Sequence, residues 1–112
     1  MTTLDQYIQK NAVQKIDFIK CDVDGAEVRF LKGARKTIST QKPIIIIEAS
    51  SEHGRDSCYE IFTELSKADY AFFSLHYKRM FRPIEAQEFK RRFKENILCI
   101  PVDKLNILSE LA

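Results

Sequence analysis

The sequence predicts a single α/β domain in which helices flank a partly parallel sheet. The first half of the chain contains a strand, a helix and a strand within about thirty residues, the usual size of a βαβ unit. Residues 44–47 are four consecutive isoleucines, a run typical of a strand buried between helices. With 112 residues, 30% charged and 45% hydrophobic, the chain has the composition of one soluble globular domain over residues 1–112.

The elements of the first half follow from local patterns. Thr3-x-x-Gln6 is a capping-box pattern and predicts a short helix at the amino terminus. Residues 16–21 predict a strand that ends in the acidic turn of residues 22–25. Apolar residues at helical spacing then predict one amphipathic helix from residue 26 to 39, followed by a strand over residues 44–48. These two strands are expected to be parallel and joined by a right-handed crossover.

The second half predicts two further strands. Ser57-x-x-Glu60 is another capping-box pattern and opens a helix with apolar positions on one side. Strands are expected over residues 70–75 and 97–100, with a helix over residues 84–94 between them. A short helix is expected at residues 102–112. The expected sheet therefore has about four strands.

Composition excludes several classes of protein. No apolar run approaches the roughly 20 residues of a membrane helix, and the first residues do not resemble a signal peptide. The three cysteines are widely spaced, which indicates reduced, buried thiols in a cytoplasmic protein. Basic residues gather in residues 78–94, but no aromatic platform accompanies them. A solvated helix face is therefore expected there, and neither a nucleic acid nor a membrane as partner.

Carboxylates cluster where the first two predicted strands end. Asp22, Asp24 and Glu27 follow the first strand, and Glu48 ends the second. Ligands of open α/β sheets bind beyond the carboxyl ends of the strands, so we expect Asp22 and Glu48 to share one edge and to form part of a site for a polar ligand. We expect Asp24, Gly25 and Glu27 to bind the substrate. Capping of the following helix by Asp24 and Glu27 is the structural alternative, and no metal is expected.

One short motif suggests a phosphatase. The segment from Asp22 to Gly25 resembles the D-x-D-G start of haloacid-dehalogenase-like phosphatases. In that family a threonine typically follows the glycine, whereas this chain has Ala26. The later lysine and the magnesium-binding acidic pair also lack counterparts, so a phosphatase is only an alternative.

A longer resemblance runs through four blocks of the chain. They are TLDQY at residues 3–7, IDFIKCDVDGAEVRFLKGARKTI at 16–38, KPIIIIEAS at 42–50 and ENILCIP at 95–101. In this order they resemble the FkbM family of S-adenosylmethionine-dependent methyltransferases. The family pattern runs T-L-D, then K-h-D-h-E-G-x-E-x-x-h-L-x-G-A, then P-h-h-h-h-E, where h is apolar. Asp24 stands where the family usually has glutamate.

The resemblance implies a fold, a cofactor and a reaction. Such methyltransferases resemble a Rossmann-like domain whose first strand ends in a glycine-rich cofactor loop, and no G-x-G occurs in this chain. The chain would therefore be a partial Rossmann-like sheet that corresponds to the family's strands four to seven and lacks the N-terminal cofactor-binding half. The implied cofactor is S-adenosylmethionine, bound weakly or not at all by this chain alone.

The implied reaction is O-methyl transfer to a sugar, a polyketide or a similar small molecule. Asp22 would position the acceptor hydroxyl or take its proton, and Glu48 would line the acceptor side. A non-enzymatic remnant that binds a partner is the alternative from another class. An upstream glycine-rich segment in the gene, or in a neighbouring reading frame, would separate these alternatives.

The resemblance also implies an exposed strand. In the family's sheet the fourth strand pairs with the first, so residues 16–21 would become an edge. We therefore expect either a missing N-terminal half as partner or a homo-oligomer, most simply a two-fold dimer with antiparallel edge strands. A monomer with the first helix folded over this edge is the alternative.

Overall fold

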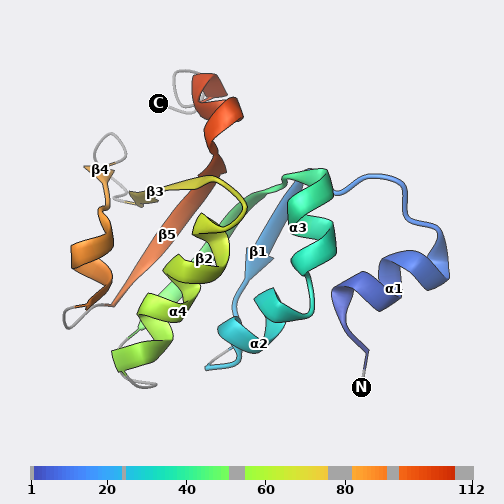
Figure 1. The fold of residues 1–112 in the computed structure, drawn as a ribbon, viewed down its shortest axis with the longest axis horizontal. Coiled ribbons are helices and arrows are strands. Elements are labelled where there is room, and N and C mark those ends of the chain that lie inside the picture. Colours follow the sequence, from blue (N-terminus) through green and yellow to red (C-terminus); the bar gives the residue numbers. More distant parts are fainter. Residues whose placement is uncertain (1, 24, 51–54, 76–81, 91–93, 108–112) are drawn as a thin grey trace.

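The computed structural model describes residues 2–23, 25–50, 55–75, 82–90 and 94–107. Their sheet has the order β1-β2-β5-β3-β4 (Figure 1). The strands are β1 (Phe18–Cys21), β2 (Ile44–Ser50), β3 (Tyr70–Ser74), β4 (Arg82–Pro83) and β5 (Lys94–Pro101). β1 and β2 are parallel, and β5 is antiparallel to both of its neighbours, β2 and β3. The chain is thus an α/β protein with a mixed sheet, which contains the expected strands and the two-residue β4.

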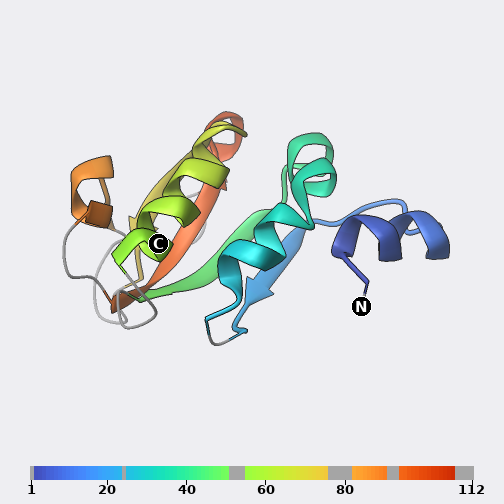
Figure 2. The same ribbon diagram turned by 60° about the horizontal axis from the view of Figure 1, so that its bottom comes forward.

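Helices flank this sheet. They are α1 (Leu4–Asn11), α2 (Glu27–Lys32), α3 (Arg35–Gln41), α4 (Arg55–Ser66) and the 3₁₀ helices η2 (Ala86–Lys90) and η3 (Val102–Ile107). Figures 1 and 2 show α2, α3 and α4 on the same side of the strands, with α1 lying beyond β1. No helix in the described part of the chain has the length and apolarity needed to cross a membrane.

The isoleucine run lies in the middle of the core. Ile45 and Ile47 face the helices and are fully buried in the cluster that includes Leu31. Ile44 and Ile46 point to the other face, where they are half-buried beside a smaller apolar cluster of Phe73, Leu98 and Ile100. Complete burial on both faces was expected, and it holds for the helix-covered face only.

The amino-terminal helix begins as predicted. Thr3 Oγ1 accepts a hydrogen bond from the backbone N–H of Gln6 at 3.2 Å. Gln6 Oε1 accepts one from the N–H of Thr3 at 3.0 Å, which completes the capping box. The second predicted capping box is wrong, because α4 begins at Arg55 and Ser57 therefore lies inside the helix.

The single helix expected over residues 26–39 is two helices, α2 and α3. They meet at Gly33, whose position leaves no room for a side chain: a Cβ there would lie 2.9 Å from both Cβ and Cγ2 of Thr3. The Gly33 carbonyl accepts a hydrogen bond from the Asp5 N–H at 3.0 Å. The Asp5 carboxylate accepts bonds from the N–H groups of Lys36 and Thr37, which caps the start of α3. The helix breaks because the amino-terminal segment docks at the break.

The helix expected over residues 84–94 is also wrong. Arg82 and Pro83 form β4, and the Ile84 N–H continues this pairing by donating to the Phe72 carbonyl at 2.8 Å. Of the described residues in this range, Ala86–Lys90 are helical, and Lys94 belongs to β5. Phe89 nevertheless points inward as expected and is fully buried.

Several expectations fall wholly or partly outside the described residues. They concern part of the basic segment of residues 78–94, Asp24, and residues 108–112 of the predicted terminal helix. The described part of that last helix, Val102–Ile107, is the 3₁₀ helix η3.

Candidate functional site

The two predicted catalytic carboxylates follow corresponding residues of the neighbouring strands β1 and β2. The parallel register pairs Cys21 with Ile47, so Asp22 and Glu48 are the next residues along two neighbouring strands. Asp22 is exposed just beyond the end of β1. Glu48 is half-buried and lies opposite Asn96 of β5. Because β2 continues to Ser50, Glu48 lies within its strand and not at its end as expected.

The turn after β1 is held from the start of α2. Gly25 has a φ of 94°, a backbone conformation that favours glycine. Glu27, the first residue of α2, accepts hydrogen bonds from the N–H groups of Val23 at 3.3 Å and Gly25 at 3.0 Å. The N-cap of α2 is Ala26, without a side-chain cap. The capping alternative is therefore wrong for Glu27, and the substrate-binding role predicted for it and for Gly25 and Asp24 stays a prediction.

The cysteines near this turn are buried and free, as the sequence indicated. Burial, together with the smaller effects of the charges of Glu27 and Asp22, raises the pKa of Cys21 to about 12. Burial and the charge of Glu27 also raise the pKa of Cys58. Burial, with a smaller effect of Cys21, raises the pKa of Cys99. These thiols stay protonated at neutral pH, so none of them serves as a thiolate nucleophile.

A groove of about 430 Å³ opens beside the same turn, between α1 and α2. Its wall includes Val23, which directly follows Asp22, and Tyr7 of α1; these side chains are 42% and 52% exposed. Phe30 and Arg29 of α2 complete a mainly apolar lining with one cationic group. This volume and lining are typical of small-molecule sites, which measure roughly 300–1,000 Å³.

Sequence reasoning missed this groove. Tyr7 belongs to the apolar side of one helix, and Val23 stands alone between acidic residues, so neither carries a local signal of a binding site. Only the proximity of Tyr7 and Val23 in the folded chain indicates a binding site. This proximity follows from the docking of α1 at Gly33. The Thr3-Leu4-Asp5 block therefore helps to build a wall beside the acidic turn.

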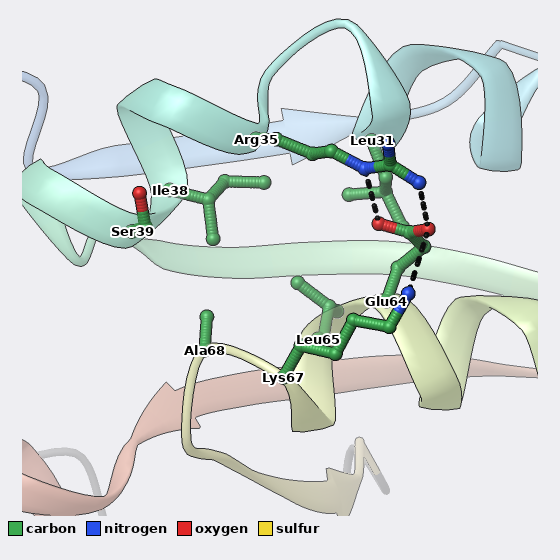
Figure 3. A pocket seen from close by; sticks show the side chains of 8 residues that line it. All are labelled: Leu31, Arg35, Ile38, Ser39, Glu64, Leu65, Lys67 and Ala68. Atoms are coloured by element: carbon green, nitrogen blue, oxygen red, sulfur yellow. Dashed lines mark hydrogen bonds and ion pairs between the residues drawn. The ribbon is translucent and has the colours of Figure 1, made fainter.

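A smaller pocket of about 210 Å³ lies between α3 and α4 (Figure 3). Arg35 donates to both oxygens of Glu64, from Nε at 3.0 Å and from Nη2 at 2.6 Å. Lys67 Nζ lies 3.7 Å from the same carboxylate. The hydrogen bond from Arg35 lowers the pKa of Glu64, although burial opposes this change. The charged side chains of this pocket pair with each other, and the rest of its lining is mainly apolar. We therefore interpret the pocket as a gap in the packing of α3 against α4 and not as a ligand site.

Comparison with known proteins gives a family match. Residues 1–72 match the model of the methyltransferase FkbM domain. The match covers more than half of the chain and includes the acidic turn and β2, hence all the predicted site residues. No curated protein and no solved structure matches the chain.

Proposed function

The chain belongs to the FkbM methyltransferase family, and from this premise we propose that it forms the acceptor side of an S-adenosylmethionine-dependent O-methyltransferase. The observation that supports this proposal most directly is the register of β1 and β2, in which Asp22 and Glu48 each follow one residue of the Cys21–Ile47 pair. The proposed acceptor is a small hydroxylated molecule, such as a sugar or a polyketide. The groove between α1 and α2 lies next to Asp22 and supports a small-molecule ligand.

Methyl transfer to a hydroxyl requires a positioned acceptor and a group that takes the hydroxyl proton. Asp22 suits this role because it is exposed at the end of a strand, and no described residue forms a hydrogen bond or ion pair with its carboxylate. Its oxygens are therefore open to a hydroxyl donor. We propose that Asp22 accepts the proton and that Glu48 lines the acceptor side. Asp24 and Gly25, in the same turn, are proposed to contact the acceptor.

The described residues do not fit the cofactor's usual cradle. A glycine-rich loop holds such a ligand with free N–H groups and with the space left by missing side chains. Here the Gly25 N–H donates to Glu27, and Thr3 fills the space where a Cβ of Gly33 would lie. Both described glycines therefore serve contacts within the protein. We propose that cofactor binding depends on an N-terminal half that supplies the loop.

The sheet edge suggests how such a half, or another chain, would attach. β1 is at the edge of the described sheet, and Phe18 on it is 52% exposed. The outer N–H and C=O groups of an edge strand are free to pair with a further strand. We propose that this edge pairs with a second copy of the chain when the N-terminal half is absent. α1 lies beyond β1 in both views, so the second copy has to fit beside this helix (Figures 1 and 2).

The catalytic proposal is tested by labelled methyl transfer to a panel of sugars and polyketide alcohols, with an N-terminal half of the family supplied. Asp22→Asn should lower kcat at least about 100-fold, because general base catalysis typically contributes 10²–10⁴-fold. Asp17→Asn is the matched control, since Asp17 is also an exposed aspartate and lies just before β1. Full activity of the Asp22 variant would exclude Asp22 as the base.

A further inference from the structure

We propose that Glu27 is a positioning residue that holds the turn after β1, so that Asp22 keeps its place beside Glu48. The inference rests on the function proposed above, because it concerns the same site. It changes the expectation from the sequence in one respect. Glu27 acts through the backbone of the turn and does not touch the acceptor.

The first argument is that both oxygens of Glu27 are already used. Oε1 accepts the hydrogen bond from Gly25 and Oε2 the one from Val23, both from backbone N–H groups. Glu27 as a whole is only 7% exposed. A buried carboxylate that is occupied on both oxygens has little left to offer a ligand in solvent. An exposed carboxylate such as Asp22 has the opposite character.

The described residues of the turn are joined to each other and to α2 by three hydrogen bonds. One backbone hydrogen bond closes it, from the Ala26 N–H to the Val23 carbonyl at 3.1 Å. The other two hydrogen bonds that the structure gives between Asp22 and α2 are both accepted by Glu27. Because no described side chain holds the Asp22 carboxylate, its position depends on β1 on one side and on this turn on the other. A displacement of about 1 Å is enough to lower the rate of a positioned reaction strongly.

The third argument concerns charge. The charge of Glu27 raises the pKa of Cys21, at the end of β1, and the pKa of Cys58, on α4. The Glu27 carboxylate therefore lies where the turn, the strand and α4 meet. Placing a charge in a buried position is costly unless hydrogen bonds compensate. Bonds from N–H groups to a carboxylate are stronger than bonds to a neutral acceptor, and they fix the donors more firmly. The free-energy cost of burying the Glu27 charge is therefore consistent with a role of this residue in keeping the turn rigid.

The test is amide hydrogen exchange measured by NMR on the chain, with Glu27→Gln as the variant. Glutamine keeps one acceptor oxygen but turns an NH₂ group toward an N–H donor. We expect the amides of Val23 and Gly25 to exchange at least about tenfold faster, while those of Ile45 and Ile47 keep their protection. The three-bond coupling between the amide and α protons of Asp22, which reports its φ angle, should move toward the averaged value of a mobile turn.

Glu64→Gln is the matched control. The Glu64 side chain is 8% exposed and also accepts two N–H bonds, but they come from Arg35 and not from the turn. This variant should leave the exchange of Val23 and Gly25 and the coupling of Asp22 unchanged. If Glu27→Gln keeps wild-type exchange and the wild-type coupling, the positioning role is wrong.

A measurement on a chain with Glu27 intact keeps the proposal testable if Glu27→Gln does not fold. The variant Asp22→Asn removes the titration of Asp22. In this variant, the amide proton chemical shifts of Val23 and Gly25 should change over the same pH range as the chemical shift of the Glu27 carboxyl carbon. Amide shifts that are independent of this carbon would overturn the proposal. Neither experiment measures methyl transfer, so their failure would leave the proposed function standing, and the failure of that function would leave these results valid.

Discussion

Asp5→Asn is the substitution whose effect follows most directly from the structure. Asp5 caps α3 from 31 residues away in the sequence. Its Oδ1 accepts from the N–H of Thr37 at 2.8 Å and from the hydroxyl of Thr37 at 2.7 Å. Its Oδ2 accepts from the N–H of Lys36 at 3.0 Å. These bonds join α1 to α3, so losing them should weaken both elements.

The expected size of the effect comes from helix capping. Loss of an N-cap acceptor costs about 0.5–2 kcal/mol. Asparagine keeps one acceptor oxygen, but its NH₂ group replaces the oxygen that faces Lys36, and the charge is lost. We therefore expect Asp5→Asn to lower the free energy of unfolding by about 1 kcal/mol, in the lower half of the capping range. Asp5→Ala, which removes every acceptor, should lie near the upper end of that range.

The effect should depend on pH. Burial alone would raise the pKa of Asp5, but the hydrogen bonds from Thr37 and Lys36 outweigh it and lower the pKa below 3.8. A carboxyl whose pKa is lower in the folded state contributes stability above its unfolded value and loses it as pH falls through the folded value. The difference between wild type and Asp5→Asn should therefore be full at neutral pH and shrink below about pH 4.

The assay is urea unfolding followed by circular dichroism, at neutral pH and at several acidic values. Asp17→Asn is the control, because the Asp17 side chain is 72% exposed and pairs only with the equally exposed Lys15. The control should leave stability unchanged. Wild-type stability of Asp5→Asn at neutral pH, or a loss that persists undiminished in acid, would refute the capping account.

Three further predictions concern the remaining features. Gly33→Ala, at an ordinary φ of −79°, should cost about 1–3 kcal/mol through contact with Thr3. Thr3→Ser, which removes Cγ2 and keeps the hydroxyl, should recover part of this loss in the double variant. Asp22→Asn and Glu48→Gln should each change unfolding free energy by less than about 1 kcal/mol, and a larger loss would assign them a structural role. Light scattering over a concentration series should show a mass above that of one 13.1 kDa chain if the β1 edge pairs, whereas a constant single-chain mass contradicts pairing.

The sequence predicted those parts of the fold that depend on local patterns. The capping box of Thr3 and Gln6 involves residues of one helical turn, and it is present as expected. The βαβ unit follows from the isoleucine run and the preceding amphipathic pattern, and β1 and β2 are parallel. In the same unit, Asp22 and Glu48 each follow one residue of the Cys21–Ile47 pair, although β2 continues past Glu48 to Ser50.

The errors arise from contacts between residues distant in the sequence. The periodicity of residues 26–39 is helical throughout, but Asp5 and Thr3 dock at Gly33 and divide the helix. In the second half, Arg82–Pro83 pair with β3, and the described residues between β4 and β5 include the short 3₁₀ helix η2. The bonds of Glu27 to the turn were missed for another reason. The spacing of Asp24 and Glu27 also matches a capping box, and only coordinates separate the two arrangements.

The central proposal is that this chain supplies the acceptor side of a methyltransferase and that its described glycines, Gly25 and Gly33, do not hold the cofactor. Calorimetric titration with S-adenosylhomocysteine tests this claim most directly, on the chain alone and on the chain with an N-terminal half that carries the glycine-rich loop. The account predicts no measurable binding by the chain alone and clear binding once that half is present. A micromolar dissociation constant for the chain alone would contradict it and would mean that these residues form a cofactor site of their own.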